Sequence, residues 1–181
     1  MSTTYNVALL VISVVVVFQT LLIFYLARYI GEFISKIESI EGVRIGSIQE
    51  GQHVPSFREV DGNGRKVVSK EVFNQRSLLL FVNSNCATCK EVVPEITRVL
   101  NTYKLEMIVV NTDELHDDSD ITRYLNDRVH YIRSSKLQQA YSITKVPFAY
   151  MIEDNLVEVS IELKGKASLW NMLINEERIA S

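Results

Sequence analysis

The sequence predicts an α/β fold with a mixed central sheet flanked by helices, preceded by one transmembrane helix. Three observations lead to this prediction. An uncharged apolar run lies near the start of the chain, at residues 7–27. Short continuous apolar runs, typical of strands buried on both faces, then alternate with helical patterns. Two glycine-containing turn dipeptides stand before the first of these runs and indicate an N-terminal hairpin.

Length and composition limit the classes of protein to consider. The chain has 181 residues, 47% of them hydrophobic, which allows one ordinary domain with a sizeable core and a short additional segment. The net charge of −3 gives no electrostatic reason to expect nucleic-acid binding. Two cysteines are too few for a small disulfide-stabilised fold.

The run at residues 7–27 has the length of a membrane-spanning helix. At 1.5 Å per residue it spans about 31 Å, close to the thickness of a bilayer's hydrocarbon layer. The alternative is a cleaved signal peptide, but residues 1–6 contain no Lys or Arg and the apolar run is longer than a signal peptide requires. We therefore expect an N-terminal tail at residues 1–6 and a single-pass, lipid-embedded helix at residues 7–27.

The segment after this helix has two parts with different sequence patterns. Its first apolar residues recur at helical spacing: Ile30, Phe33, Ile37 and Ile40. Residues 42–54 then contain three glycines and little periodicity, as linkers do. We assign residues 28–55 to a juxtamembrane amphipathic helix and linker, and residues 56–181 to the folded domain.

The first half of the domain is predicted to be a hairpin followed by a βαβ unit. Residues 61–64, Asp-Gly-Asn-Gly, accept the positive φ of a tight turn between strands at 56–60 and 65–68. The elements expected next are a short helix at 69–75, a strand at 78–82, a helix running to residue 100 and a strand at 107–110. The two strands are then parallel, joined by a right-handed crossover.

The second half is predicted to end in an antiparallel pair of strands. The expected elements are helices at 119–129 and 136–141, strands at 148–152 and 157–163 joined by a turn at 153–155, and a closing helix at 167–178.

Cys86 and Cys89 form a Cys-x-x-Cys sequence between a buried strand and a helix. At a helix N-terminus the free backbone N–H groups favour a thiolate at Cys86. Cys89 follows one turn later on the same side of the helix, within disulfide reach. Such a pair can attack a partner's disulfide and then resolve the mixed disulfide.

Other interpretations of the two cysteines are weaker. A structural zinc site needs four ligands, and His53, His116 and His130 are scattered singly. A permanent bridge across so short a loop gains little chain entropy.

The acidic residues at 113–120 lack the spacing and turn glycine of a calcium loop, so we interpret them as a solvated acidic loop. We therefore expect no metal site.

Two prolines add to this pattern. Pro147 stands directly before the strand at 148–152, where it is either a cis-proline or an ordinary turn proline. Pro94 follows Cys89 by five residues and should kink the helix that begins at the cysteines.

The strand at 78–82, Cys86-Ala87-Thr88-Cys89, Pro94 and Val146-Pro147 together resemble the thioredoxin fold. With the Asp-Gly-Asn-Gly hairpin and the apolar helix, the chain is similar to membrane-tethered extracytoplasmic redoxins of the cytochrome-maturation type. The most similar group is the redoxins that assist maturation of methylamine dehydrogenase.

This resemblance implies a role for each site residue. Cys86 is the expected nucleophile and Cys89 the resolving thiol. Pro147 is the expected cis-proline beside the pair, and the Val146 backbone is expected to bind an extended substrate segment. The implied partners are a client protein with cysteines or disulfides and a second redox protein that resets the dithiol. No cofactor beyond the Cys86–Cys89 disulfide is implied.

The sequence departs from the family pattern near the cysteines. Asn85 stands where many relatives have Trp. Leu80 and Val92 occupy the two positions where thioredoxins or cytochrome-maturation redoxins carry an acidic residue. The usual proton acceptor for Cys89 is therefore missing from both places, and oxidation, reduction and isomerisation of clients all stay open.

Two arguments disagree on the side of the membrane. Arg28, Lys36 and Arg44 follow the apolar helix while no basic residue precedes it, so the positive-inside rule places the domain in the cytoplasm. Disulfide exchange is most useful outside the cytoplasm, where the relatives lie. We expect an extracytoplasmic domain.

Three functions fit the sequence. The first is a membrane-anchored thiol–disulfide oxidoreductase that matures an exported protein. The second is a redox-inactive maturation chaperone or binding module that uses the same fold. The third is a metal chaperone that uses the same two thiols. The sequence favours the first.

Overall fold

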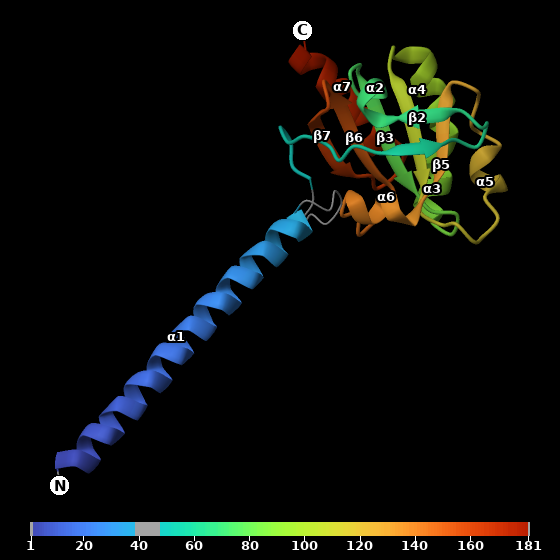
Figure 1. Ribbon diagram of the computed structural model, residues 1–181. Helices are drawn as coiled ribbons and strands as arrows, with labels where there is room; N and C mark the ends of the chain where they lie inside the picture. The colour runs from blue at the N-terminus through green and yellow to red at the C-terminus, as the bar shows by residue number, and fades with distance from the viewer. Residues whose placement is uncertain (1, 39–47, 181) are drawn as a thin grey trace. The chain divides into compact units, whose positions relative to one another are not determined.

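The computed structural model describes residues 2–38 and 48–180, which belong to two separate units (Figure 1). The first unit is one helix, α1 (Ser2–Glu38). Within it, Tyr5–Leu26 is long and apolar enough to cross a membrane, with a mean hydropathy of 2.9. The predicted spanning segment at residues 7–27 is thus helical. The part of the predicted linker at residues 42–47 lies outside the described residues.

The second unit is built on a five-stranded mixed sheet in the order β5-β4-β3-β6-β7. Its strands are β3 (Ser77–Val82), β4 (Glu106–Asn111), β5 (Val129–Arg133), β6 (Phe148–Glu153) and β7 (Leu156–Glu162). β3, β4 and β5 run parallel, whereas β6 is antiparallel to both β3 and β7. The predicted parallel and antiparallel pairs are confirmed, and every residue of the central strand β3 is buried.

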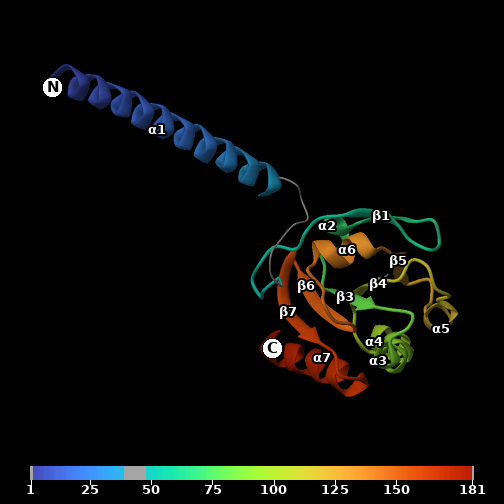
Figure 2. The same cartoon turned by 90° about the horizontal axis from the view of Figure 1, so that it is seen from below.

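Helices cover both faces of this sheet (Figure 2). One face carries α3 (Ala87–Val92), α4 (Ile96–Thr102) and the closing helix α7 (Lys166–Ala180). The other carries α2 (Ser69–Val72), α6 (Ser135–Ala140) and the hairpin. Because side chains of a strand alternate between faces, each face has its own core: Leu78 and Leu80 point into one, Leu79 and Phe81 into the other. This is the predicted layered α/β fold.

The predicted hairpin is formed by β1 (Arg58–Val60) and β2 (Lys66–Val68), which pair as a separate two-stranded sheet. The buried side chain of Asp61 holds the turn, because its Oδ1 accepts the backbone N–H groups of Asn63 and Arg65. Gly64 has φ +79°, a conformation that glycine adopts without strain.

The predicted kink at Pro94 is confirmed. A 3₁₀ turn, Val93–Glu95, separates α3 from α4. Proline lacks the N–H that an uninterrupted helix needs at this position, so the hydrogen-bond ladder is broken there.

The predicted helix at residues 119–129 is wrong beyond its first turn. The helix α5 covers only Ser119–Thr122, and the chain then turns at Asn126 into strand β5, which the sequence analysis did not identify. Asn126 accepts the N–H of Arg128 on its side chain and that of Val129 on its carbonyl, and this local turn leads the chain into β5 in place of further helix. β5 is an edge strand with a mixed burial pattern, so it lacks the continuous apolar run of β3.

Residues 48–54, which the sequence analysis assigned to the linker, pack onto the domain. Ile48 is fully buried against the core on the hairpin side of the sheet. Gly51 N–H donates to Val157 O, and Val157 N–H donates to Gln52 O, so this segment covers the start of the edge strand β7. These bonds use the backbone alone, and for that reason the side-chain pattern gave no sign of them.

Candidate functional site

Three loops meet at one edge of the central sheet, the edge formed by the ends of its strands. Cys86 follows the carboxyl end of β3, residues 112–118 follow the carboxyl end of β4, and Val146-Pro147 precedes β6. Because β6 runs antiparallel to β3, its amino end lies at the same edge as the carboxyl ends of β3 and β4. In open α/β sheets this edge is where functional groups usually gather.

Cys86 is the N-cap residue of α3. It has extended backbone angles, and its Sγ accepts the backbone N–H of Cys89 at 3.2 Å. Its thiol also lies 3.5 Å from the carbonyl oxygen of Val146, to which it donates. Cys86 is half-buried, and both thiols are free. A sulfur that is open to solvent and faces a backbone N–H donor is placed as a nucleophilic thiolate needs to be.

Cys89 lies in a different environment. Its side chain is fully buried in the same core cluster as Leu80 and Val92. Burial raises the pKa of the Cys89 thiol far above its usual value, and the hydrogen bond with Cys86 adds to this effect. The two positions where relatives carry an acid are thus apolar and lie in the cluster that surrounds the second sulfur.

The Val146–Pro147 peptide bond is cis. Pro147 is buried, and its carbonyl accepts the N–H of Leu163 at 2.8 Å, which fixes the loop to the end of β7. Val146 is half-buried and turns its carbonyl toward Cys86. The structure therefore brings the four residues singled out in the sequence to one place.

Asparagine side chains tie the cysteine loop to the neighbouring loop, and the sequence analysis assigned them no such role. Asn83 Oδ1 accepts the backbone N–H of Asn85, and Asn83 Nδ2 donates to Thr112 Oγ1 at 3.1 Å. Asn85 Nδ2 donates to Asp113 Oδ2 at 3.3 Å. These bonds fix the backbone that leads into Cys86. The available signal was the cluster of Asn and Ser directly after a buried strand, which favours side-chain-to-backbone turns.

Asp113 is the exception within the loop that we expected to be solvated. Its side chain is only 9% exposed. Backbone hydrogen bonds from Leu115 and His116 lower the pKa of the Asp113 carboxyl below its usual value. The loop is therefore held in one shape, and the apolar side chain of Leu115 within it is 91% exposed.

Histidines and acids do not gather into a metal site in the described part of the chain, where no group of three or more His, Cys, Asp or Glu side chains has suitable geometry. His116 Nδ1 lies 2.7 Å from Asp113, whereas His130 Nδ1 lies 2.9 Å from Asp61. Each of these two histidines thus has a carboxylate partner of its own.

Comparison with known proteins identifies the family. Residues 51–161 match the family described as TraF, F plasmid transfer operon protein. The chain belongs to the TraF family. The methylamine utilization protein MauD of Methylobacillus flagellatus is 26% identical to this TraF-family chain over 119 residues, which cover 65% of the chain and 57% of MauD. The chain thus matches a little over half the length of this curated relative, and it is a thioredoxin-fold redoxin related to MauD.

Solved structures confirm the fold of this TraF-family chain. The thioredoxin domain of a thiol-disulfide oxidoreductase from Bacteroides vulgatus superposes with a TM-score of 0.57 at 18% identity, covering 71% of this chain and 98% of that domain. The thiol:disulfide interchange protein DsbE from Chlorobium tepidum gives 0.57 at 19% identity, with the same coverage. At these identities the likeness establishes a thioredoxin-like fold.

Proposed function

We propose that this chain is a membrane-anchored thiol–disulfide oxidoreductase that exchanges disulfides with a client protein through Cys86 and Cys89. One observation carries the proposal: the half-exposed Cys86 sulfur lies between the N–H of Cys89 and the carbonyl of Val146, at the open edge of the sheet. The resemblance to redoxins that assist maturation supports a client that is matured after export, and the similarity to MauD, a methylamine utilization protein, agrees with that resemblance.

The exchange proceeds in two balanced steps. The Cys86 thiolate attacks one sulfur of a client disulfide, so that a Cys86–client disulfide forms and the client's other sulfur leaves as a thiolate. Cys89 then loses its proton and attacks the Cys86 sulfur, which releases the second client thiolate and leaves the Cys86–Cys89 disulfide. The client gains two electrons and the pair loses two. A second redox protein returns the pair to the dithiol state, and the reverse sequence oxidises a client.

The loop at Val146-Pro147 is proposed to bind the client. The Val146 carbonyl lies beside the reacting sulfur, where an extended client segment can add its backbone N–H groups, as in strand addition. Such a segment aligns its own sulfur with Cys86 without any need for a particular side chain. The bound segment takes the place of the Cys86 thiol as the partner of this carbonyl.

The surroundings of Cys89 favour a second candidate function. In this function the chain grips its client through Cys86 without turnover. The raised pKa of Cys89 and its apolar surroundings slow the deprotonation on which the second step depends. The two functions differ in what Cys89 does, and the test therefore changes Cys89.

The substitution Cys89→Ser in the full chain distinguishes the two functions. If the chain is an oxidoreductase, removal of the resolving thiol abolishes turnover of a disulfide substrate and traps Cys86–client mixed disulfides in cells. Acid-quenched lysates on non-reducing gels, followed by mass spectrometry of the trapped species, provide the measurement. Cys86→Ser is the matched control, and it should trap nothing.

A Cys89→Ser chain that supports client maturation as well as the unaltered chain would contradict the oxidoreductase proposal. That outcome would favour the gripping function instead.

A further inference from the structure

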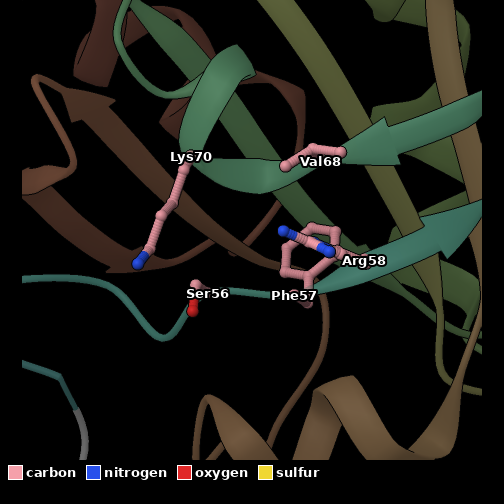
Figure 3. A pocket seen from close by; sticks show the side chains of 5 residues that line it. All are labelled: Ser56, Phe57, Arg58, Val68 and Lys70. Atoms are coloured by element: carbon pink, nitrogen blue, oxygen red, sulfur yellow. The ribbon is translucent and has the colours of Figure 1, made fainter.

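A pocket of about 300 Å³ lies beside the hairpin, away from the two cysteines (Figure 3). It is lined by Ser56, Phe57, Arg58, Val68 and Lys70. Figure 3 shows Lys70 on one side of this pocket and Arg58 on the other. No acidic side chain is among the lining residues, and the volume is at the small end of the range for ligand sites.

The walls of the pocket are fixed by two reciprocal hydrogen bonds. Phe57 N–H donates to Ser69 Oγ at 2.8 Å, and Ser69 N–H donates to Phe57 O at 3.1 Å. The Phe57 ring packs edge-on against Phe73 and Tyr141 of the core. The next residue on each segment is a basic one, Arg58 after the half-buried Phe57 and Lys70 after the buried Ser69, so both cations follow residues that pack into the domain.

The polar side chains of this pocket can all donate hydrogen bonds, and none of them has a partner among the described residues. Arg58 and Lys70 make no ion pair or hydrogen bond there, in contrast to Arg65, Lys90 and Arg98, which all have carboxylate partners. The Ser56 hydroxyl also lacks a partner in this part of the chain. Two cations and a hydroxyl thus line one pocket with no carboxylate among its lining residues, and such a set of donors suits an anion.

We propose that this pocket binds a phosphate group. A guanidinium offers a fork of N–H donors, an ammonium adds a compact charge from the opposite side, and a hydroxyl completes a set that matches the oxygens of a phosphate. Phe57 and Val68 supply an apolar wall for whatever carbon skeleton the phosphate carries. The phosphate belongs to an anionic phospholipid headgroup or to a soluble phosphate compound.

The remainder of the hairpin surface favours a ligand at a membrane surface. Val60, 62% exposed, and the exposed Lys66 pair with each other across the two strands. Basic side chains that alternate with exposed apolar ones are typical of surfaces that contact anionic lipid headgroups. The apolar segment Tyr5–Leu26 belongs to the same chain, so insertion of that segment would keep lipid phosphates at high local concentration.

The test uses the full chain in lipid nanodiscs and follows backbone amide chemical shifts of residues 56–70. In one arm, inorganic phosphate is titrated into neutral phosphatidylcholine discs at constant ionic strength. In the other arm, discs contain increasing fractions of phosphatidylglycerol and no added phosphate. Saturable shifts centred on Phe57, Arg58 and Lys70 are expected in at least one arm. Shifts in the lipid arm alone identify a headgroup, and shifts with inorganic phosphate identify a soluble compound as an additional ligand.

Three variants locate the binding. Arg58→Gln and Lys70→Gln should each weaken it about tenfold, since each removes one charge-assisted contact. Lys104→Gln removes the same charge from an exposed position outside the hairpin, and should leave the binding constant unchanged. The absence of saturable shifts in both arms would overturn the proposal. An equal loss in Lys104→Gln would overturn it too, because the attraction would then be general to the surface.

Discussion

Cys86 and Cys89 are one helical turn apart but have opposite surroundings. Cys86 is half-buried with a backbone N–H directed at its sulfur, whereas Cys89 is fully buried among apolar side chains. The first sulfur can therefore meet a large partner, and the second can meet only the first. This asymmetry is what the division into attacking and resolving thiols requires.

Alkylation of the reduced, folded chain should distinguish the two thiols. At pH 8 we expect iodoacetamide to modify Cys86 at least about tenfold faster than Cys89, because Cys89 is inaccessible and burial raises its pKa. Peptide mapping by mass spectrometry at timed quenches gives both rates. In guanidinium chloride the two cysteines should react alike, and equal rates in the folded chain would contradict the described burial of Cys89.

Among the elements, the hairpin depends most on polar contacts. Asp61 Oδ2 lies 2.7 Å from the Arg65 guanidinium and 2.9 Å from His130 on β5. Arg65 also donates to the carbonyl of Val129, and Gly62 N–H donates to Tyr131 O. The hairpin is thus joined to the edge of the sheet by one buried carboxylate and its partners.

Asp61→Asn should destabilise the fold at neutral pH and change its response to acid. Burial alone would raise the pKa of Asp61, but hydrogen bonds from His130 and Arg65 outweigh burial and lower it below the ordinary value of 3.8. Because the folded-state pKa is lowered, this stabilisation is complete well above pH 3.8 and is lost as the pH falls through the folded-state value. We expect the variant to lose about 3 kcal/mol at pH 7.

Urea unfolding at pH 7 and pH 3 measures both effects. The difference in unfolding free energy between the original chain and Asp61→Asn should shrink at the lower pH. Asp154→Asn, in the exposed turn between β6 and β7, removes a carboxylate without such partners and should change little at either pH. A constant difference across this range would show that the charge of Asp61 is not what holds the hairpin.

The elements that the sequence predicted well are those with a strong local signal. β3 is a run of apolar residues buried on both faces, and the hairpin turn is specified by its glycines and Asp61. β5 was missed because it lies at the sheet edge and only Val129 and Ile132 of its five side chains are buried, so it has neither a continuous apolar run nor a regular alternation. Residues 48–54 were missed because backbone hydrogen bonds hold them to β7, and the buried Ile48 is a single apolar residue without a periodic pattern around it.

The same distinction applies to the site. The two cysteines and Pro147 were visible in the sequence because their chemistry and spacing are specific. The contacts of Asn83 with Thr112 and of Asn85 with Asp113 join residues almost thirty positions apart, and they depend on the register of β3 beside β4. A single sequence carries no direct record of such pairings.

At the scale of the whole molecule, we propose that the apolar helix anchors the domain to a membrane and that the domain is extracytoplasmic. After treatment of intact cells with a permeant reductant, a membrane-impermeant maleimide should then label Cys86, which is the more accessible of the only two thiols in the chain. A Cys86→Ser chain should lose most of the signal. Labelling that occurs only after lysis would place the domain in the cytoplasm, as the positive-inside rule suggests.

The central claim is that Cys86 and Cys89 interconvert between a dithiol and a disulfide. The most direct measurement equilibrates the full chain across a series of glutathione redox buffers, traps free thiols with an alkylating reagent and reads the mass of the intact protein. We predict one transition in which both cysteines lose the label together. Two cysteines that stay alkylated at every ratio, or a Cys86–glutathione adduct that persists beside a free Cys89, would contradict the claim.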